Sequence, residues 1–187
     1  MNTLITNDFI NALRTHSAID ATEEKYRLDT ISFIERHPNS WWQRSTVEGH
    51  VTAAAWLLNA ARTHALLLHH AKLDRWLQPG GHLDDTDGSP AQGALREAME
   101  ETGIQGLALD TATLFDIDVH LIPARNNEAA HLHYDARYVV LADETNVSLN
   151  SESLGARWLT LHDIAASRMD ESIVRLAKKN LLRNHNI

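Results

Sequence analysis

The sequence predicts an α/β fold, a mixed β-sheet with helices packed on its faces, preceded by an amino-terminal helical arm. Strand-like segments precede, flank and follow one strongly marked helix in the middle of the chain. Residues 1–45 differ from them in composition and carry apolar residues at helical spacing. With 187 residues, the chain has the length of one domain with a short appendage. We expect an arm over 1–45 and a folded domain over 46–187.

The arm should hold two helices. Asn7 is expected to cap the first, which carries Phe9, Ile10 and Leu13. The second should run from residue 21 until Pro38 stops it. The arm would either join two copies in a homodimer or close over the site, and the sequence does not decide between these roles.

Alternating or continuous apolar runs predict the strands that follow. WLQPGGHLDD is expected to lead through a Pro-Gly-Gly loop toward the central helix. The two last segments of the chain have helical patterns. The predicted strands are 50–59, 64–70, 113–123, 131–142 and 156–161, and the closing helices are 162–168 and 170–185.

Composition excludes several classes of function. Lys plus Arg number 17 against 25 for Asp plus Glu, a net charge of −8, which argues against a nucleic-acid backbone as partner. The absence of cysteine excludes thiolate metal sites and cysteine nucleophiles, and it fits a reducing cytoplasm. No apolar run reaches the ~20 residues that span a bilayer, and no signal-peptide core is present. We expect a soluble, cytoplasmic protein without a membrane partner. Twelve histidines are many for this length.

The central helix should run over 90–102. Ser89 is a hydroxyl cap, Pro90 suits the first helical position, Gln92 completes a capping box, and Gly103 is a natural C′ residue. Small apolar residues, Ala91, Ala94 and Ala98 with Leu95, form a face that can pack closely on a sheet.

The same helix carries three acids where anions are least stable. Glu97, Glu100 and Glu101 lie within about 100° of arc, in the last turns, where the helix dipole disfavours negative charge. Arg96 offsets part of the repulsion. A solvated charged face would explain the acids without a function. A hard cation, Mg²⁺ or Mn²⁺, would instead relieve their repulsion, with a carbonyl of the preceding Gly80-Gly81 loop as a further ligand.

These residues resemble the signature of the Nudix hydrolases, G-x5-E-x7-R-E-U-x-E-E-x-G-U. Gly81 takes the first glycine, and the run REAMEETGI supplies the R-E pair, the E-E pair and the closing Gly103-Ile104. Between Gly81 and Arg96 stand 14 residues, one more than the pattern has. We place the extra residue in the loop 82–88, which leaves either Asp87 or Gly88 at the position of the first glutamate.

The resemblance implies a Nudix α/β/α sandwich and metal-dependent hydrolysis of a nucleoside diphosphate linked to another moiety. Glu97, Glu100 and Glu101, with Gly81, would hold Mg²⁺ or Mn²⁺, and Arg96 would orient the acids. The signature, Gly81–Ile104, is called the box below. The base would be a box glutamate such as Glu97 or Glu101, or a downstream acid, for which Glu152 is the candidate. A binding module that senses a nucleotide is the alternative, although it would not need the full set of acids. An isoprenoid diphosphate isomerase is disfavoured, because the main family of that activity uses a cysteine.

Polar residues alternate with apolar ones on two later strands, so several share a face. If the strands pair, they form a polar wall that suits a phosphorylated substrate. His82, next to Gly81, is a further candidate contact. A solvated sheet face explains the alternation equally well, and a separate histidine metal site is the least favoured reading. The candidate substrate contacts are His82, Asp118, His120, His133, Asp135 and Arg137.

Overall fold

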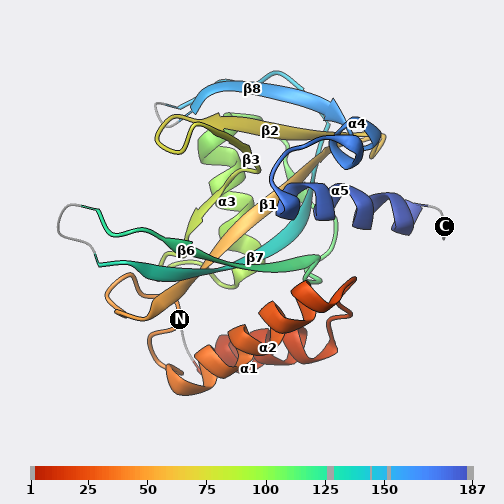
Figure 1. Cartoon of the computed structure of the whole chain (residues 1–187). Helices are drawn as coiled ribbons and strands as arrows, with labels where there is room; N and C mark the ends of the chain where they lie inside the picture. The colour runs from red at the N-terminus through yellow and green to blue at the C-terminus, as the bar shows by residue number, and fades with distance from the viewer. Residues whose placement is uncertain (1–2, 126–128, 144, 151–152, 185–187) are drawn as a thin grey trace. The chain divides into compact units, whose positions relative to one another are not determined.

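A computed structural model describes residues 3–125, 129–143, 145–150 and 153–184 (Figure 1). The helices are α1 (Thr3–Thr15), α2 (Ala21–Arg36), α3 (Pro90–Thr102), α4 (Leu161–Ala166) and α5 (Glu171–Asn184). The strands are β1 (Gly49–Asn59), β2 (His64–His70), β3 (Arg75–Leu77), β4 (Gly80–His82), β5 (Ala108–Leu109), β6 (Asp116–Ile122), β7 (His131–Ala142) and β8 (Ser153–Thr160).

The described strands belong to one sheet. Its main path is β3-β2-β1-β7-β5, and in addition β4 pairs with β1, β6 with β7 and β8 with β2. The chain divides into two compact units, the first comprising Met1–Ala54, Gly81–Ala94 and Ala112–Tyr138, and the second Ala55–Gly80, Leu95–Thr111 and Val139–Ile187. The mixed sheet, the flanking helices and the amino-terminal helices that the sequence predicts are confirmed.

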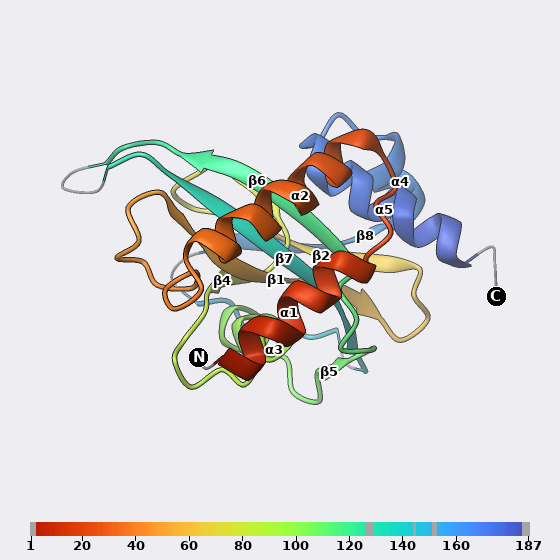
Figure 2. The same ribbon diagram turned by 90° about the horizontal axis from the view of Figure 1, so that it is seen from below.

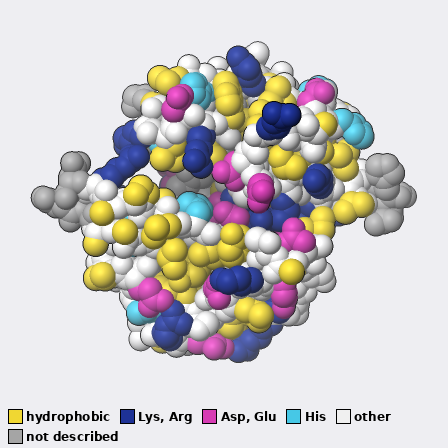
Figure 3. All heavy atoms as spheres, viewed as in Figure 1, with side chains coloured by type: hydrophobic (Ala, Val, Ile, Leu, Met, Phe, Trp, Pro, Cys, Tyr) yellow, Lys and Arg dark blue, Asp and Glu magenta, His cyan; other side chains and the backbone are white. Residues whose placement is uncertain are grey.

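In the first unit, α1 and α2 lie against each other, and α2 packs on β6 (Figure 2). Phe33 of α2 stacks on Tyr134 of β7 with ring centroids 4.3 Å apart. Over these helices basic and acidic side chains are interspersed (Figure 3), and Arg14 pairs with Glu35 at 2.9 Å. The helical pair therefore covers part of the sheet with its apolar side and presents charge on the other.

In the second unit, β2 pairs antiparallel with β8 along its whole length and also with β3. Helices α4 and α5 pack on each other, and α4 also contacts β8. The core is apolar and includes Ala98, from the small-residue face of α3. The other buried members are Ala55, Leu57, Leu66, Leu68, Ile104, Leu107, Val140 and Ala142. This packing fixes the rotation of the carboxyl half of α3.

Two sequence expectations about elements are wrong. Asn7 does not cap α1, because the helix already begins at Thr3 and Asn7 lies inside it. The Pro79-Gly80-Gly81 stretch is not wholly loop, since Gly80–His82 forms β4, which pairs with β1. Glycine has low strand propensity, so pairing with a long neighbour rather than the local sequence makes this strand. The division into an arm of 1–45 and a domain of 46–187 stays a prediction.

None of the helices among the described residues is long and apolar enough to cross a membrane.

Candidate active site

The central helix begins and ends where the sequence predicts. Ser89 Oγ accepts a hydrogen bond from the backbone amide of Gln92 at 3.2 Å, which caps the amino end. The Gln92 side chain reaches back to the amide of Gly88, at 3.1 Å. At the carboxyl end Gly103 has φ +63° and donates to the carbonyl of Met99 at 2.9 Å. The two ends thus hold the acidic turns in one fixed register.

The four charged box residues lie together in the second unit. Arg96 contacts Glu97 at 2.9 Å and Glu100 at 3.4 Å, so one guanidinium joins two of the three acids. The Glu97 side chain is only 14% exposed, whereas that of Glu100 is 58% exposed. The arginine therefore keeps part of the like-charge repulsion in check and orients the more buried acid.

Glu101 is the most buried of the three box acids, with 9% exposure. Its Oε2 accepts a hydrogen bond from the backbone amide of Gly80 at 3.3 Å, which ties the end of α3 to the glycine pair before the box. Two largely buried carboxylates and one exposed carboxylate on one helix form an all-oxygen donor set. That chemistry fits Mg²⁺ or Mn²⁺.

Two further sequence candidates remain, Gly81 and Glu152. Gly81, expected to offer a carbonyl to the metal, lies within β4 and belongs to the first unit. Glu152, the candidate base, lies outside the described residues. Neither assignment is tested, and both stay predictions.

The loop before the helix is closed by Asp87. Its Oδ2 accepts a hydrogen bond from the amide of Asp84 at 2.8 Å, and the side chain is buried. Gly93 lies directly against it, since a Cβ there would stand 3.0 Å from Asp87 Oδ2. Of the two residues that the spacing leaves open for the first signature acid, Asp87 is therefore the one with a structural role as an acid.

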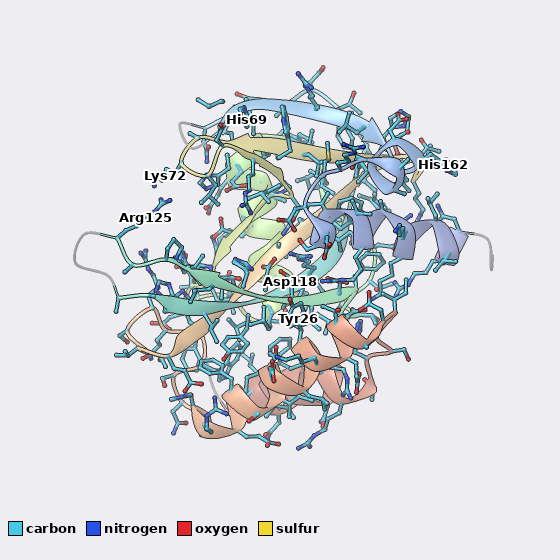
Figure 4. The ribbon with its side chains drawn as sticks, in the orientation of Figure 1. Tyr26, His69, Lys72, Asp118, Arg125 and His162 are labelled. Atoms are coloured by element: carbon cyan, nitrogen blue, oxygen red, sulfur yellow. The ribbon has the colours of Figure 1, made fainter. Side chains whose placement is uncertain are left out.

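The polar residues of β6 and β7 come together as the alternation predicts. In the antiparallel register Asp116 faces Arg137, Asp118 faces Asp135, and His120 faces His133. Figure 4 shows Asp118 on β6. The six side chains thus lie at three alternate cross-strand pairs, on one face of the two strands in the first unit.

Burial separates the acidic end of this wall from the histidine end. Asp116, Asp118, Asp135 and Arg137 are all buried, so the reading of a solvated sheet face is wrong for them. The sheet face they occupy is covered, and a polar alternation alone does not reveal that cover. His120, by contrast, is exposed and lies 3.4 Å from Asp118.

One guanidinium serves the three buried aspartates. Arg137 lies 2.9 Å from Asp135, 3.3 Å from Asp116 and 3.3 Å from Asp118. Thr52 donates a further hydrogen bond to Asp135 at 3.0 Å. Burial alone would lower the pKa of Arg137, but the aspartates outweigh it and raise that pKa above its ordinary value. The guanidinium stays charged and engaged inside the first unit.

Histidines gather at the other end of the wall. His133 lies beside His120 and His82, with ring centroids 5.6 Å and 5.3 Å away. His50 of β1, which the sequence reasoning did not single out, lies 4.6 Å from His133 and 4.9 Å from His82. The unusually high histidine count was the signal that could have found it.

Comparison with known proteins matches this layout to one family. The family model described as NUDIX domain matches residues 48–179, well over half of the chain. Comparison with curated proteins found no match.

Solved structures share the fold at low identity. A C. elegans Ap4A hydrolase in a binary complex has a TM-score of 0.57 and 19% identity, over 73% of this chain and 98% of that one. The E. coli dihydroneopterin triphosphate pyrophosphohydrolase has a TM-score of 0.55 and 18% identity, over 69% of this chain and 92% of that one. The NUDIX domain of Shewanella oneidensis NrtR, complexed with ADP ribose, has a TM-score of 0.53 and 18% identity, over 80% of this chain and 96% of that one.

The fold, the acid-bearing helix and the family model together define a domain of the pyrophosphohydrolase class. The chain belongs to the Nudix family.

Proposed function

We propose that this protein hydrolyses the diphosphate linkage of a nucleoside diphosphate joined to another moiety, in a reaction that depends on Mg²⁺ or Mn²⁺. The observation that carries the proposal is the helix end, where Glu97, Glu100 and Glu101 gather around Arg96 and the Gly80 amide. A helix does not collect three acids in its last turns for stability, because the dipole and their mutual repulsion both oppose it.

The box acids differ in burial, and we assign their roles accordingly. Glu97 and Glu101, which are largely shielded from water, would hold the cation together with the more exposed Glu100. When bound, such a cation neutralises charge on phosphate oxygens and lowers the pKa of a bound water. Arg96 fixes the direction of the Glu97 carboxylate. Gly81 is proposed as a carbonyl ligand, and Glu152 is one candidate for the base beside the box acids.

The substrate class is a proposal that the neighbours support. Two of them are an Ap4A hydrolase and a dihydroneopterin triphosphate pyrophosphohydrolase, and the third is a NUDIX domain complexed with ADP ribose. All three ligands contain a phosphoanhydride. We place His82, His120 and His133 nearest to the substrate, since they are less buried than the acidic end of the wall; Asp118, Asp135 and Arg137 would then act chiefly by supporting that surface.

The test is product release from a panel of diphosphates with Mg²⁺ or Mn²⁺. It should include ADP-ribose, NADH, dinucleoside polyphosphates, nucleoside triphosphates, CDP-alcohols and sugar nucleotides. We expect turnover of one class that is lost with EDTA and in Glu101→Gln. Binding of a panel member by calorimetry without any product would instead favour a nucleotide-sensing module and overturn the proposal.

A further inference from the structure

A histidine cluster lies in the first unit, outside the box helix, and comprises His50, His82, His120, His131 and His133. These are five of the twelve histidines in the chain. His50, His82 and His133 come from β1, β4 and β7, and β1 neighbours both other strands in the sheet. Sheet pairing therefore brings these three imidazoles together.

Three members of the cluster have metal-ligand geometry. One ring nitrogen from each of His50, His82 and His133 lies within 4.8 Å of the other two. Nitrogens that share a tetrahedral Zn²⁺ at 2.0–2.1 Å stand about 3.3 Å apart. Small rotations of the half-buried His82 and His133 side chains would close the remaining gap.

His50 supplies an independent observation. It is 2% exposed, and neither of its ring nitrogens has a hydrogen-bond partner among the described residues. Buried polar atoms are nearly always satisfied, so an imidazole left in this state calls for a ligand that the protein itself does not provide. The ring lies beside the rings of His82, His131 and His133, with centroids 4.9 Å, 5.1 Å and 4.6 Å away.

The other members of the cluster support such a ligand. His131 hydrogen-bonds to His133, with ring nitrogens 3.3 Å apart, and a partner of this kind fixes the orientation of a ligating ring. A cavity of about 400 Å³ opens beside the cluster, lined by all three of the candidate ligands and by His131, Arg44 and Thr46. A water or an exchangeable anion can therefore occupy a fourth position.

We propose that His50, His82 and His133 form a second metal site that takes Zn²⁺ or a similar imidazole-binding divalent ion. Its all-nitrogen donor set differs from the all-oxygen set of the box helix, and imidazole suits Zn²⁺, Co²⁺, Ni²⁺ and Cu²⁺ but not Mg²⁺. His82 and His133 are also placed near the substrate under the proposed function, but ion binding at this site is measured without any turnover, so the two proposals can fail separately.

Protonation favours the same conclusion, because a metal needs the neutral ring. Burial lowers the pKa of His50 to about 3, and the imidazole of His82 adds to the shift. Burial likewise lowers the pKa of His133 to about 2, with His50 next in effect. Both rings are neutral at neutral pH.

The test is Zn²⁺ binding to the full chain, purified without a histidine tag and freed of metal by chelator. Calorimetry is run in excess Mg²⁺, which occupies oxygen sites, and Co²⁺ absorption spectra report the geometry. We expect one tight Zn²⁺ per chain and the visible bands of tetrahedral Co²⁺. His82→Gln and His133→Gln should each weaken binding by roughly a hundredfold or more. Zn²⁺ should also raise the Tm of the parent chain, but not of these variants.

Two controls separate this site from others. His162→Gln changes an exposed histidine on α4 (Figure 4) and should bind Zn²⁺ like the parent chain. Glu101→Gln removes a box acid and should leave the Co²⁺ spectrum unchanged. The proposal is overturned if the parent chain binds no Zn²⁺ in Mg²⁺, if either His82→Gln or His133→Gln binds it normally, or if Glu101→Gln abolishes binding. The Zn²⁺ affinity of His50→Gln is interpreted only if that variant folds. The affinities of His82→Gln and His133→Gln decide the outcome without it.

Discussion

Glu101 and Gly80 are joined by a hydrogen bond, in which the glycine amide donates to Oε2 at 3.3 Å. The contact spans 21 residues of sequence and links the last turn of α3 to the start of β4. It explains how a carboxylate near the carboxyl end of a helix is kept in place although the helix dipole disfavours it there.

Glu101→Gln should abolish turnover and leave the fold intact. The amide oxygen of glutamine can still accept from the Gly80 amide, but the charge that a cation needs is gone. We expect a loss in kcat of at least about a hundredfold, with Tm within a few degrees. Glu171→Gln, the same change at an exposed position on α5, is the control. Equal activity in Glu101→Gln would remove the box acids from the mechanism.

Arg137→Met should be among the most destabilising single changes in the chain. It leaves three buried aspartates without their shared guanidinium, and breaking a buried pair costs about 3–5 kcal/mol. Arg14→Met removes an exposed pair with Glu35 and should cost less than about 1 kcal/mol. Urea unfolding measures both. Similar losses in the two variants would mean that the buried cluster contributes no more than a surface pair.

Gly103→Ala and Gly106→Ala separate backbone strain from packing. Both glycines have positive φ, +63° and +72°, so alanine costs about 1 kcal/mol at either position. At Gly103 the new Cβ would also stand 2.9 Å from Ser148 Cβ and the Ser148 carbonyl oxygen, whereas at Gly106 it meets nothing within 4 Å. Gly103→Ala should therefore lose about 1 kcal/mol more than Gly106→Ala. Thermal unfolding checks the difference, and equal losses would show that the neighbouring Ser148 segment yields freely.

The ion pair between Arg62 and Asp110 should add stability only above the acid range. Hydrogen bonding from Arg62 lowers the pKa of Asp110, and Arg62 Nη1 donates to Asp110 Oδ2 at 2.8 Å. A lowered carboxyl pKa contributes stability at neutral pH that is lost as pH falls through the folded-state value. Asp110→Asn should cost about 1 kcal/mol at pH 7.

The pH series supplies its own control. Once the parent carboxyl is protonated it resembles the asparagine, so the difference between parent chain and variant should shrink toward zero as the pH approaches about 2. A difference that stays constant from neutral to acid pH would show that the pair acts through shape and not through charge.

Local signals predicted the box helix and the facing strands well. Ser89 and Gly103 mark the two ends of α3 by cap chemistry that depends on few neighbours. Strict alternation gave the bounds of β7, and antiparallel pairing then placed Asp116 opposite Arg137. Such features depend on the hydrophobic periodicity and on the capping residues at the ends of each element, so one sequence suffices to predict them.

Features that depend on segments distant in the sequence were not predicted. Alternation shows which residues share a face but not whether a helix covers it, so the burial of Asp118 and Arg137 was not foreseen. β4 is held by its partner strand and not by its own residues. His50 lies beside the other histidines only because β1 neighbours β4 and β7 in the sheet. No local sequence pattern predicts that arrangement of strands.

The cluster of Arg137 with Asp116, Asp118 and Asp135 also limits how this protein can change over time. Because one guanidinium contacts all three carboxylates, the effect of altering any member depends on the state of the others. Apolar replacement of the whole group can be neutral or stabilising, while each single step toward it exposes a buried charge without a partner. We therefore expect the four residues to be replaced together in evolution or not at all.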